Sequence, residues 1–309
     1  MHYNKPPFSV TDQGKQLQDR GLVCHDPERM KHYLAHVGYY RLSAYCLPFE
    51  QVSADPTGSR NHQFKPGTTF EQILSLYIFD RKLRLLVMEA MERIEVSVRS
   101  RWAGAVALRH GSHAHMLSGL FKCPWQHARD LARIAGELER SSETFVVHYR
   151  SRYSEPFLPP IWAIVETMSL GTLSRWFANT RDTDAKKEVM KGLGLPTIEV
   201  LEKVLHALTP VRNVCAHHGR LWNRSFALSL PVIKRMRDQL VSPEAPYHQA
   251  HHIFNYLVIM EALMRSINPR SSWASRVMKL LDTVGVAEHR AMGFPDDWKQ
   301  RKPWQGAQV

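Results

Sequence analysis

The sequence has few of the features that mark secreted, membrane-spanning or zinc-ribbon proteins. It contains no run of eighteen or more apolar residues, so we expect no membrane-spanning helix. Its first residues lack the apolar stretch of a signal peptide. Four cysteines lie far apart in 309 residues and form no CxxC pair, which argues against a zinc ribbon or a disulfide framework. These absences favour a protein of the reducing cytoplasm without a membrane partner.

Apolar and polar residues rarely alternate over the length of a strand, whereas helical spacing recurs along the chain. The longest example predicts a helix over 70–108, with one buried stripe at helical intervals: Leu76, Leu83, Val87, Ala90, Ile94 and Val98. The predicted fold class is therefore all-α, a helical bundle. A turn-rich loop over 53–67 separates an N-terminal helical extension (1–60) from a helical domain (65–309), and we expect the two to form one continuous structural unit.

Three further helical predictions bear on the later argument. Apolar and polar residues over 126–149 favour a single helix. After Gly171 the sequence indicates a tight break, with Ser174 capping a short helix over 175–179. Thr197 is expected to cap a further helix that buries several leucines and leads toward position 210.

Acidic residues are outnumbered, with 29 Asp and Glu against 41 Lys and Arg, and the formal net charge is +12. Such an excess favours a polyanionic partner, chiefly nucleic acid, over a soluble protein that happens to be basic. No low-complexity run or basic tail carries this charge, so it must lie over folded surface. The 17 histidines lack matching Cys or carboxylate partners in sequence. We therefore expect solvated histidines, with no metal and no other cofactor.

One short segment, 209–224, concentrates groups that bind phosphate or transfer protons. In metal-free RNA cleavage the ribose 2′-hydroxyl attacks phosphorus while an imidazole transfers protons and a guanidinium stabilises charge. His217 has the side chain suited to proton transfer near neutral pH, and Arg212 offers a planar, permanently charged phosphate clamp. Asn213 lies one turn before His217 and can orient its ring. A helix-end salt bridge with a capping histidine is the structural alternative.

Pro210 leaves two local geometries open for this segment. Either the helix kinks at Pro210, or Thr209 caps a new helix with Pro210 at its first position. In the second geometry Arg212 lies in a first turn, where free amides and the helix dipole favour a phosphate. Gly219 is the expected C-terminal stop of the helix.

Two acidic features and one aromatic run have alternative explanations. Glu166 is a lone acid in an apolar helix, so it should pair with a base or face a polar cavity. For Glu92 and Glu95, a solvated helix face is favoured over a polar site. The run 38–45 favours an aromatic core patch, with its arginine pairing a buried carboxylate, over a surface that stacks unpaired bases.

Several segments together resemble the abortive-infection proteins of the AbiD/AbiF type, bacterial members of the HEPN superfamily of helical ribonucleases. These segments are Arg212-Asn-x-x-x-His217-His-x-Arg-Leu-Trp-Asn-Arg224, Gly38-Tyr-Tyr-Arg-Leu-Ser-x-Tyr45, Ile94-Glu-Val-Ser-Val-Arg99, Glu166-x-Met-Ser-x-Gly-x-Leu-Ser174 and Met292-Gly-Phe-Pro-x-x-Trp298. They span nearly the whole chain. A proline at position 210 departs from the family pattern, which more often has a helix-compatible residue there.

The resemblance implies a HEPN-type helical bundle and a metal-independent endoribonuclease of a phage-defence or toxin–antitoxin system, with Arg212 and His217 as the catalytic pair. HEPN nucleases usually bring two motifs together by dimerising, so we expect a homodimer. Relatives are associated with small non-coding RNAs, which makes a catalytically silent RNA-binding protein the alternative. Further RNA contacts are expected from the rest of the motif and from the aromatic run: His218, Arg220, Trp222, Asn223, Arg224, Tyr40 and Arg41.

Overall fold

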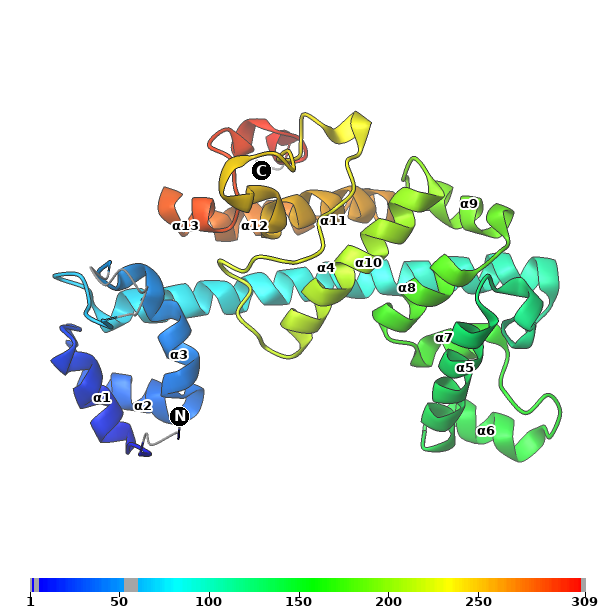
Figure 1. The fold of residues 1–309 in the computed structure, drawn as a ribbon, viewed down its shortest axis with the longest axis horizontal. Helices are drawn as coiled ribbons and strands as arrows, with labels where there is room; N and C mark the ends of the chain where they lie inside the picture. Colours follow the sequence, from blue (N-terminus) through cyan, green and yellow to red (C-terminus); the bar gives the residue numbers. More distant parts are fainter. Residues whose placement is uncertain (1, 3–5, 53–60, 307–309) are drawn as a thin grey trace. The chain divides into compact units, whose positions relative to one another are not determined.

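The computed structural model describes residue 2 and residues 6–52 and 61–306 (Figure 1). Over these residues β-pairing is limited to three isolated bridges, and the regular secondary structure is otherwise helical. The predicted all-α class is confirmed. The α-helices of the described residues are α1 (Val10–Asp19), α2 (Pro27–Val37), α3 (Tyr39–Cys46), α4 (Phe70–His110), α5 (Pro124–Glu139), α6 (Thr144–Arg152), α7 (Ile161–Thr167), α8 (Leu170–Asn179), α9 (Thr183–Gly192), α10 (Ile198–Ala216), α11 (Ile253–Ile267), α12 (Trp273–Leu281) and α13 (Val286–Ala291).

The chain divides into two compact units, residues 1–82 and 83–309, and the division falls within α4. In the N-terminal unit α1 packs on α2, and Gly14 leaves room for the Met30 side chain between them. Helix α3 is tied to the first part of α4 by a buried hydrogen bond that the Tyr45 hydroxyl donates to Asp80 at 2.6 Å. A buried hydroxyl and carboxylate satisfy each other there, as burial of polar groups requires.

The core of the C-terminal unit is built along α4. Leu83, Val87, Ala90, Ile94 and Val98 are each fully buried, which confirms the predicted stripe. Helix α10 crosses α4, and α8 lies beside α10 (Figure 1). Apolar side chains at helical spacing thus give α4 one continuous face on which the other helices pack.

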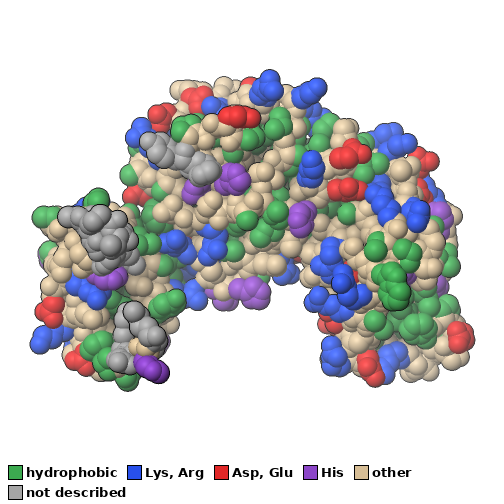
Figure 2. All heavy atoms as spheres, in the orientation of Figure 1, with side chains coloured by type: hydrophobic (Ala, Val, Ile, Leu, Met, Phe, Trp, Pro, Cys, Tyr) green, Lys and Arg blue, Asp and Glu red, His purple; other side chains and the backbone are tan. Residues whose placement is uncertain are grey.

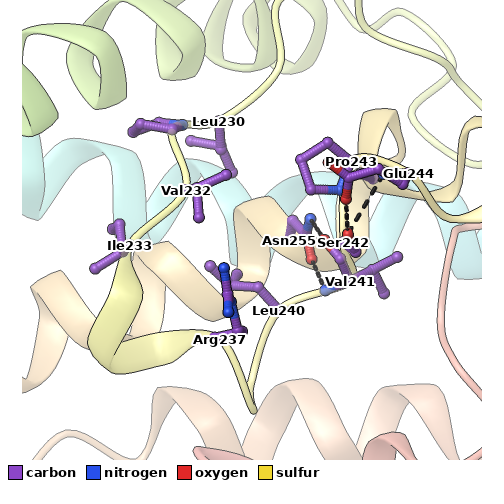
Figure 3. Close-up of a pocket in the computed structure, with 12 residues that line it drawn as sticks. Leu230, Val232, Ile233, Arg237, Leu240, Val241, Ser242, Pro243, Glu244 and Asn255 are labelled. Atoms are coloured by element: carbon purple, nitrogen blue, oxygen red, sulfur yellow. Dashed lines mark hydrogen bonds between the residues drawn. The ribbon is translucent and has the colours of Figure 1, made fainter.

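Helix α11 is apolar on nearly all sides and lies deep in the C-terminal unit. Its Asn255 is buried and holds the preceding loop: the side-chain oxygen accepts from the Val241 N–H at 2.8 Å, and the amide donates to the Val241 carbonyl at 2.9 Å (Figure 3). The indole of Trp273 in α12 donates to the Leu86 carbonyl of α4 at 2.7 Å. None of the described helices has the length and apolar character to cross a membrane.

Two helical predictions were wrong. The single helix expected over 126–149 is interrupted between α5 and α6, where the Ser141 side chain accepts the Glu143 N–H and offers the backbone an alternative to the helix. The break expected after Gly171 is absent from this described segment: α8 already begins at Leu170, with the Ser169 side chain accepting the Thr172 N–H. Ser174 is buried inside α8 and caps nothing.

Candidate functional site

Helix α10 carries the predicted motif and continues through Pro210 to Ala216, with Thr197 as its N-cap. Thr209 does not start a new helix, because its hydroxyl donates to the Leu205 carbonyl one turn earlier at 2.9 Å. The geometry with Pro210 at a first helical position is therefore wrong. Arg212 lies near the C-terminal end of α10, so a helix N-terminus does not help it to bind phosphate.

The guanidinium of Arg212 faces α4. Its Nε lies 3.6 Å from Oε2 of Glu95, and its side chain remains 29% exposed. Glu95 is 7% exposed, so the solvated face expected for this residue was wrong. Within the described residues the buried Arg212 Nε has no hydrogen-bond partner, so the ion pair with Glu95 is a loose one.

The same carboxylate also binds Arg99, one helical turn further along α4. Arg99 donates in addition to the main-chain carbonyl of Met168, and its Nη1 lies 3.5 Å from Glu166 Oε2. Glu166 is thus paired with a base, as predicted. One buried carboxylate lies between two arginines, and the second carboxylate is half-exposed and, among the described residues, pairs with Arg99 alone. The positive charge of Arg212 is therefore only partly balanced.

Helix α10 ends in a tight turn that presents two histidines. His217 is the C-cap residue and is exposed. The His218 N–H donates to Cys215 O at 3.1 Å and the Gly219 N–H to Val214 O at 2.8 Å, the two bonds of a Schellman turn. The left-handed position of this turn is His218 (φ 56°), not Gly219, which corrects the predicted stop. Left-handed backbone at a residue other than glycine costs free energy and is common at functional sites.

The chain after Gly219 is anchored by apolar residues. Leu221 and Trp222 are 0% and 2% exposed, so the Trp222 ring packs in the interior and is not offered to an external base. Asn223 is exposed and left-handed (φ 51°), and the Arg224 Nε donates to the Arg220 carbonyl at 2.7 Å. This loop therefore leaves polar groups at the surface beside His217.

Arg212 and His217 do not point in the same direction. Five residues of α-helix turn the chain by about 140°, and Arg212 faces α4 while His217 is exposed at the helix end. Asn213 is exposed on the same face as His217, and its carbonyl accepts the His217 N–H at 3.0 Å. Both members of the pair are accessible to solvent, since neither is buried.

The remaining predicted contacts lie in the N-terminal unit. Tyr40 and Arg41 are exposed on α3, and Tyr40 is 92% exposed. The core patch favoured for the run 38–45 holds for Leu42 and Tyr45, which are 2% and 1% exposed. The run therefore has a buried face and an open face, each with its own aromatics.

On the face that Figure 2 shows, Lys and Arg side chains are spread over the surface with Asp and Glu at several places between them. Within the described residues no three His, Cys, Asp or Glu side chains come together to form a metal site. Among the residues that the structure describes, His115 is an unusual titratable group: it is fully buried, and neither ring nitrogen has a hydrogen-bond partner. Burial lowers the pKa of His115 to about 3, with smaller effects from His113 and His127.

A small cavity of about 130 Å³ lies over the loop that Asn255 holds (Figure 3). Its lining is largely apolar, with Arg237 and Glu244 among the side chains around it. None of the predicted site residues lines it.

Comparison with known proteins assigns the chain to a family. A family model described as Abi-like protein matches residues 32–223, more than half of the chain. The chain belongs to the Abi-like protein family. Searches of curated proteins and of solved structures found no significant match.

The Abi-like match includes three of the five segments that carry the sequence resemblance and all of the 212–224 segment except Arg224, and 292–298 lies outside it. In space, three of these segments meet: Glu95 and Arg99 from α4, Glu166 and Met168 from α7 and its end, and Arg212 from α10. Glu95 and Arg99 were missed as site residues. The sequence does indicate that Glu95 lies on the buried side of its helix, because it comes four residues after Met91 and three before Val98, both of which are buried.

Proposed function

We propose that this Abi-like protein is a metal-independent endoribonuclease of the HEPN type and acts in phage defence by abortive infection or as the toxin of a toxin–antitoxin pair. The observation that carries the proposal is the combination of an exposed imidazole, His217, and a partly balanced guanidinium, Arg212, at one end of α10. Membership of the Abi-like family supports the defence role.

In the proposed reaction the 2′-hydroxyl of a ribose attacks the adjacent phosphorus, and the 5′-oxygen of the next nucleotide leaves. His217 takes or supplies the proton, and Asn213 on the same face orients its ring. Arg212 stabilises the negative charge on the phosphate oxygens. Products with 2′,3′-cyclic phosphate and 5′-hydroxyl ends follow from this chemistry.

RNA contacts outside the catalytic pair are assigned to the exposed or half-buried groups of the loop after α10: His218, Arg220, Asn223 and Arg224. Trp222 serves this loop as a buried anchor. Because Arg212 and His217 of one chain point apart, the proposal includes a homodimer in which the two motifs face one RNA strand. The two left-handed residues, His218 and Asn223, give the loop a fixed shape for that contact.

The experiment is incubation of the full-length protein with RNA in EDTA, followed by analysis of the product ends. We expect cyclic phosphate ends, and loss of cleavage by at least about 100-fold in His217→Ala and in Arg212→Ala. Matched controls are His206→Ala, an exposed histidine on the same helix, and Arg270→Ala, an exposed arginine elsewhere. Products with 3′-hydroxyl ends, or cleavage that survives both substitutions, would overturn the proposal.

One observation favours a second candidate, a silent RNA-binding protein. Glu95 lies close enough to Arg212 to hold its guanidinium away from a phosphate. Such a protein would co-purify with RNA, retain it after EDTA treatment and show no turnover as a dimer. A small non-coding RNA is the partner that this candidate implies.

A further inference from the structure

A pocket of about 690 Å³ in the N-terminal unit combines aromatic, cationic and acidic side chains. Its lining comes from the residues just before α1, from α1, from α3 and from the segments on either side of residues 53–60. The volume falls within the range of small-molecule sites and leaves ample room for one nucleobase. The floor is apolar, since Leu17, Cys46 and Phe64 are each less than 5% exposed.

Aromatic rings stand around the opening of this pocket. Tyr40 is 92% exposed and Phe8 is 49% exposed, so folding alone does not bury either ring. The Tyr39 hydroxyl accepts a hydrogen bond from Arg20 Nη1 at 2.5 Å, which fixes the Tyr39 side chain and holds a guanidinium in the pocket lining. Exposed rings and a guanidinium that line the same pocket are groups of the kind on which an unpaired base stacks.

The wall of the pocket carries an acceptor. Glu50 lines it with a side chain only 9% exposed, and His62 Nδ1 lies 3.8 Å from Oε1 of Glu50. His62 has a left-handed backbone (φ 58°), an uncommon conformation for a residue other than glycine. A carboxylate accepts hydrogen bonds only, and guanine presents two adjacent N–H donors on its Watson–Crick edge. The wall therefore distinguishes guanine from bases that offer an acceptor there.

We propose that this pocket holds one unpaired nucleobase of a single-stranded RNA, guanine in preference to uracil. The base stacks on Tyr40 and directs its N–H edge toward Glu50, and Arg20 binds a neighbouring phosphate. Residues 1–82 contain ten Lys and Arg against eight Asp and Glu, so base contacts rather than net charge carry the recognition. The choice of RNA as the polymer rests on the proposed function.

The test uses full-length protein that carries His217→Ala, so that binding is measured without cleavage. The probes are a fluorescent uridine 10-mer and the same 10-mer with one central guanosine. We expect tighter binding of the guanosine probe, weakened about tenfold by Tyr40→Ala and kept within about twofold by Tyr40→Phe, which retains the ring. Glu50→Gln should abolish the preference for guanosine while uridine binding persists.

Equal affinity of both probes for the parent, or equal affinity of the parent and Tyr40→Ala for the guanosine probe, would overturn the proposal. Because Tyr40 is almost wholly exposed, its alanine variant should fold even if Glu50→Gln does not. Guanosine monophosphate is the second probe: if it binds as tightly as the 10-mer, the site takes free nucleotides and the assignment to RNA is wrong. If the unsubstituted protein cleaves no RNA but Tyr40-dependent binding is found, only the proposed catalysis fails.

Discussion

Oε2 of Glu95 on α4 lies 3.6 Å from Nε of Arg212 on α10. This contact joins two segments that are far apart in sequence, and the same carboxylate also binds Arg99. Because Arg99 is held by three groups, its orientation is fixed, and it fixes Glu95 in turn. Glu95 can therefore set the direction of the Arg212 side chain without touching substrate.

Glu95→Gln is expected to lower cleavage about tenfold, because a neutral amide orients Arg212 less firmly than a carboxylate does. The free energy of unfolding should fall by about 2 kcal/mol, since two arginines lose the charge between them. Cleavage rates under single-turnover conditions and urea denaturation measure the two effects. Glu92→Gln, an exposed acid on the same helix, should change neither.

If Glu95 only stabilises the fold and does not position Arg212, the experiment gives a different result. In that case Glu95→Gln would lose stability but keep the single-turnover rate of the folded protein at the wild-type value. If cleavage instead rises, Glu95 restrains Arg212, and the role of a positioning residue is wrong. Cleavage rates are measured at a temperature at which Glu95→Gln and the wild-type protein both remain folded.

His218→Gly separates the structural role of the α10 turn from its contacts. Glycine is the favoured residue at the left-handed position of a Schellman turn, so the substitution should raise the free energy of unfolding by about 1 kcal/mol. RNA affinity should fall, because the imidazole is lost while the turn is kept. Chemical denaturation and oligonucleotide binding by the cleavage-deficient protein test the two expectations, and unchanged RNA affinity would remove His218 from the interface.

The all-α class could be predicted from the sequence because buried stripes such as the one along α4 depend on local spacing alone. The position of Glu95 could not be predicted in this way. An acid on the buried side of a helix is stable only when distant arginines meet it, and Arg212 reaches it through the tertiary fold. Trp222 shows the converse: it was expected among the RNA contacts, but its side chain is buried and anchors the loop.

The residue that takes the left-handed position at the end of α10 could not be predicted from the local sequence either. Glycine is the usual left-handed residue at a helix end, so Gly219 was expected to take that position. A Cβ at Gly219 would lie 3.2 Å from Val214 O and 3.3 Å from Val214 Cγ1, so a larger residue there would press on the last turn of α10. The residue with left-handed backbone in this turn is His218.

Gly171 in the first turn of α8 is expected to limit how closely α8 and α10 approach. A Cβ there would lie 3.2 Å from Thr209 Cγ2, one residue before Pro210. Gly171→Ala should be tolerated within about 1 kcal/mol, whereas Gly171→Val should destabilise the protein by about 2 kcal/mol because its branches have no space. Thermal denaturation of both variants measures this, and equal melting temperatures would show that α8 can move away.

His115 makes the stability of the C-terminal unit depend on pH. In the folded protein its pKa is lowered to about 3, chiefly by burial, while the ordinary value is 6.5. Between these two values the unfolded chain binds a proton that the folded protein does not, so stability is full above about pH 6.5 and falls as the pH decreases. From pH 7.5 to 5.0 the loss should be about 2 kcal/mol. His115→Leu should flatten this part of the urea-denaturation profile, whereas His206→Leu, at an exposed site, should not. A profile of His115→Leu as steep as that of the wild type would show that another group causes the acid sensitivity.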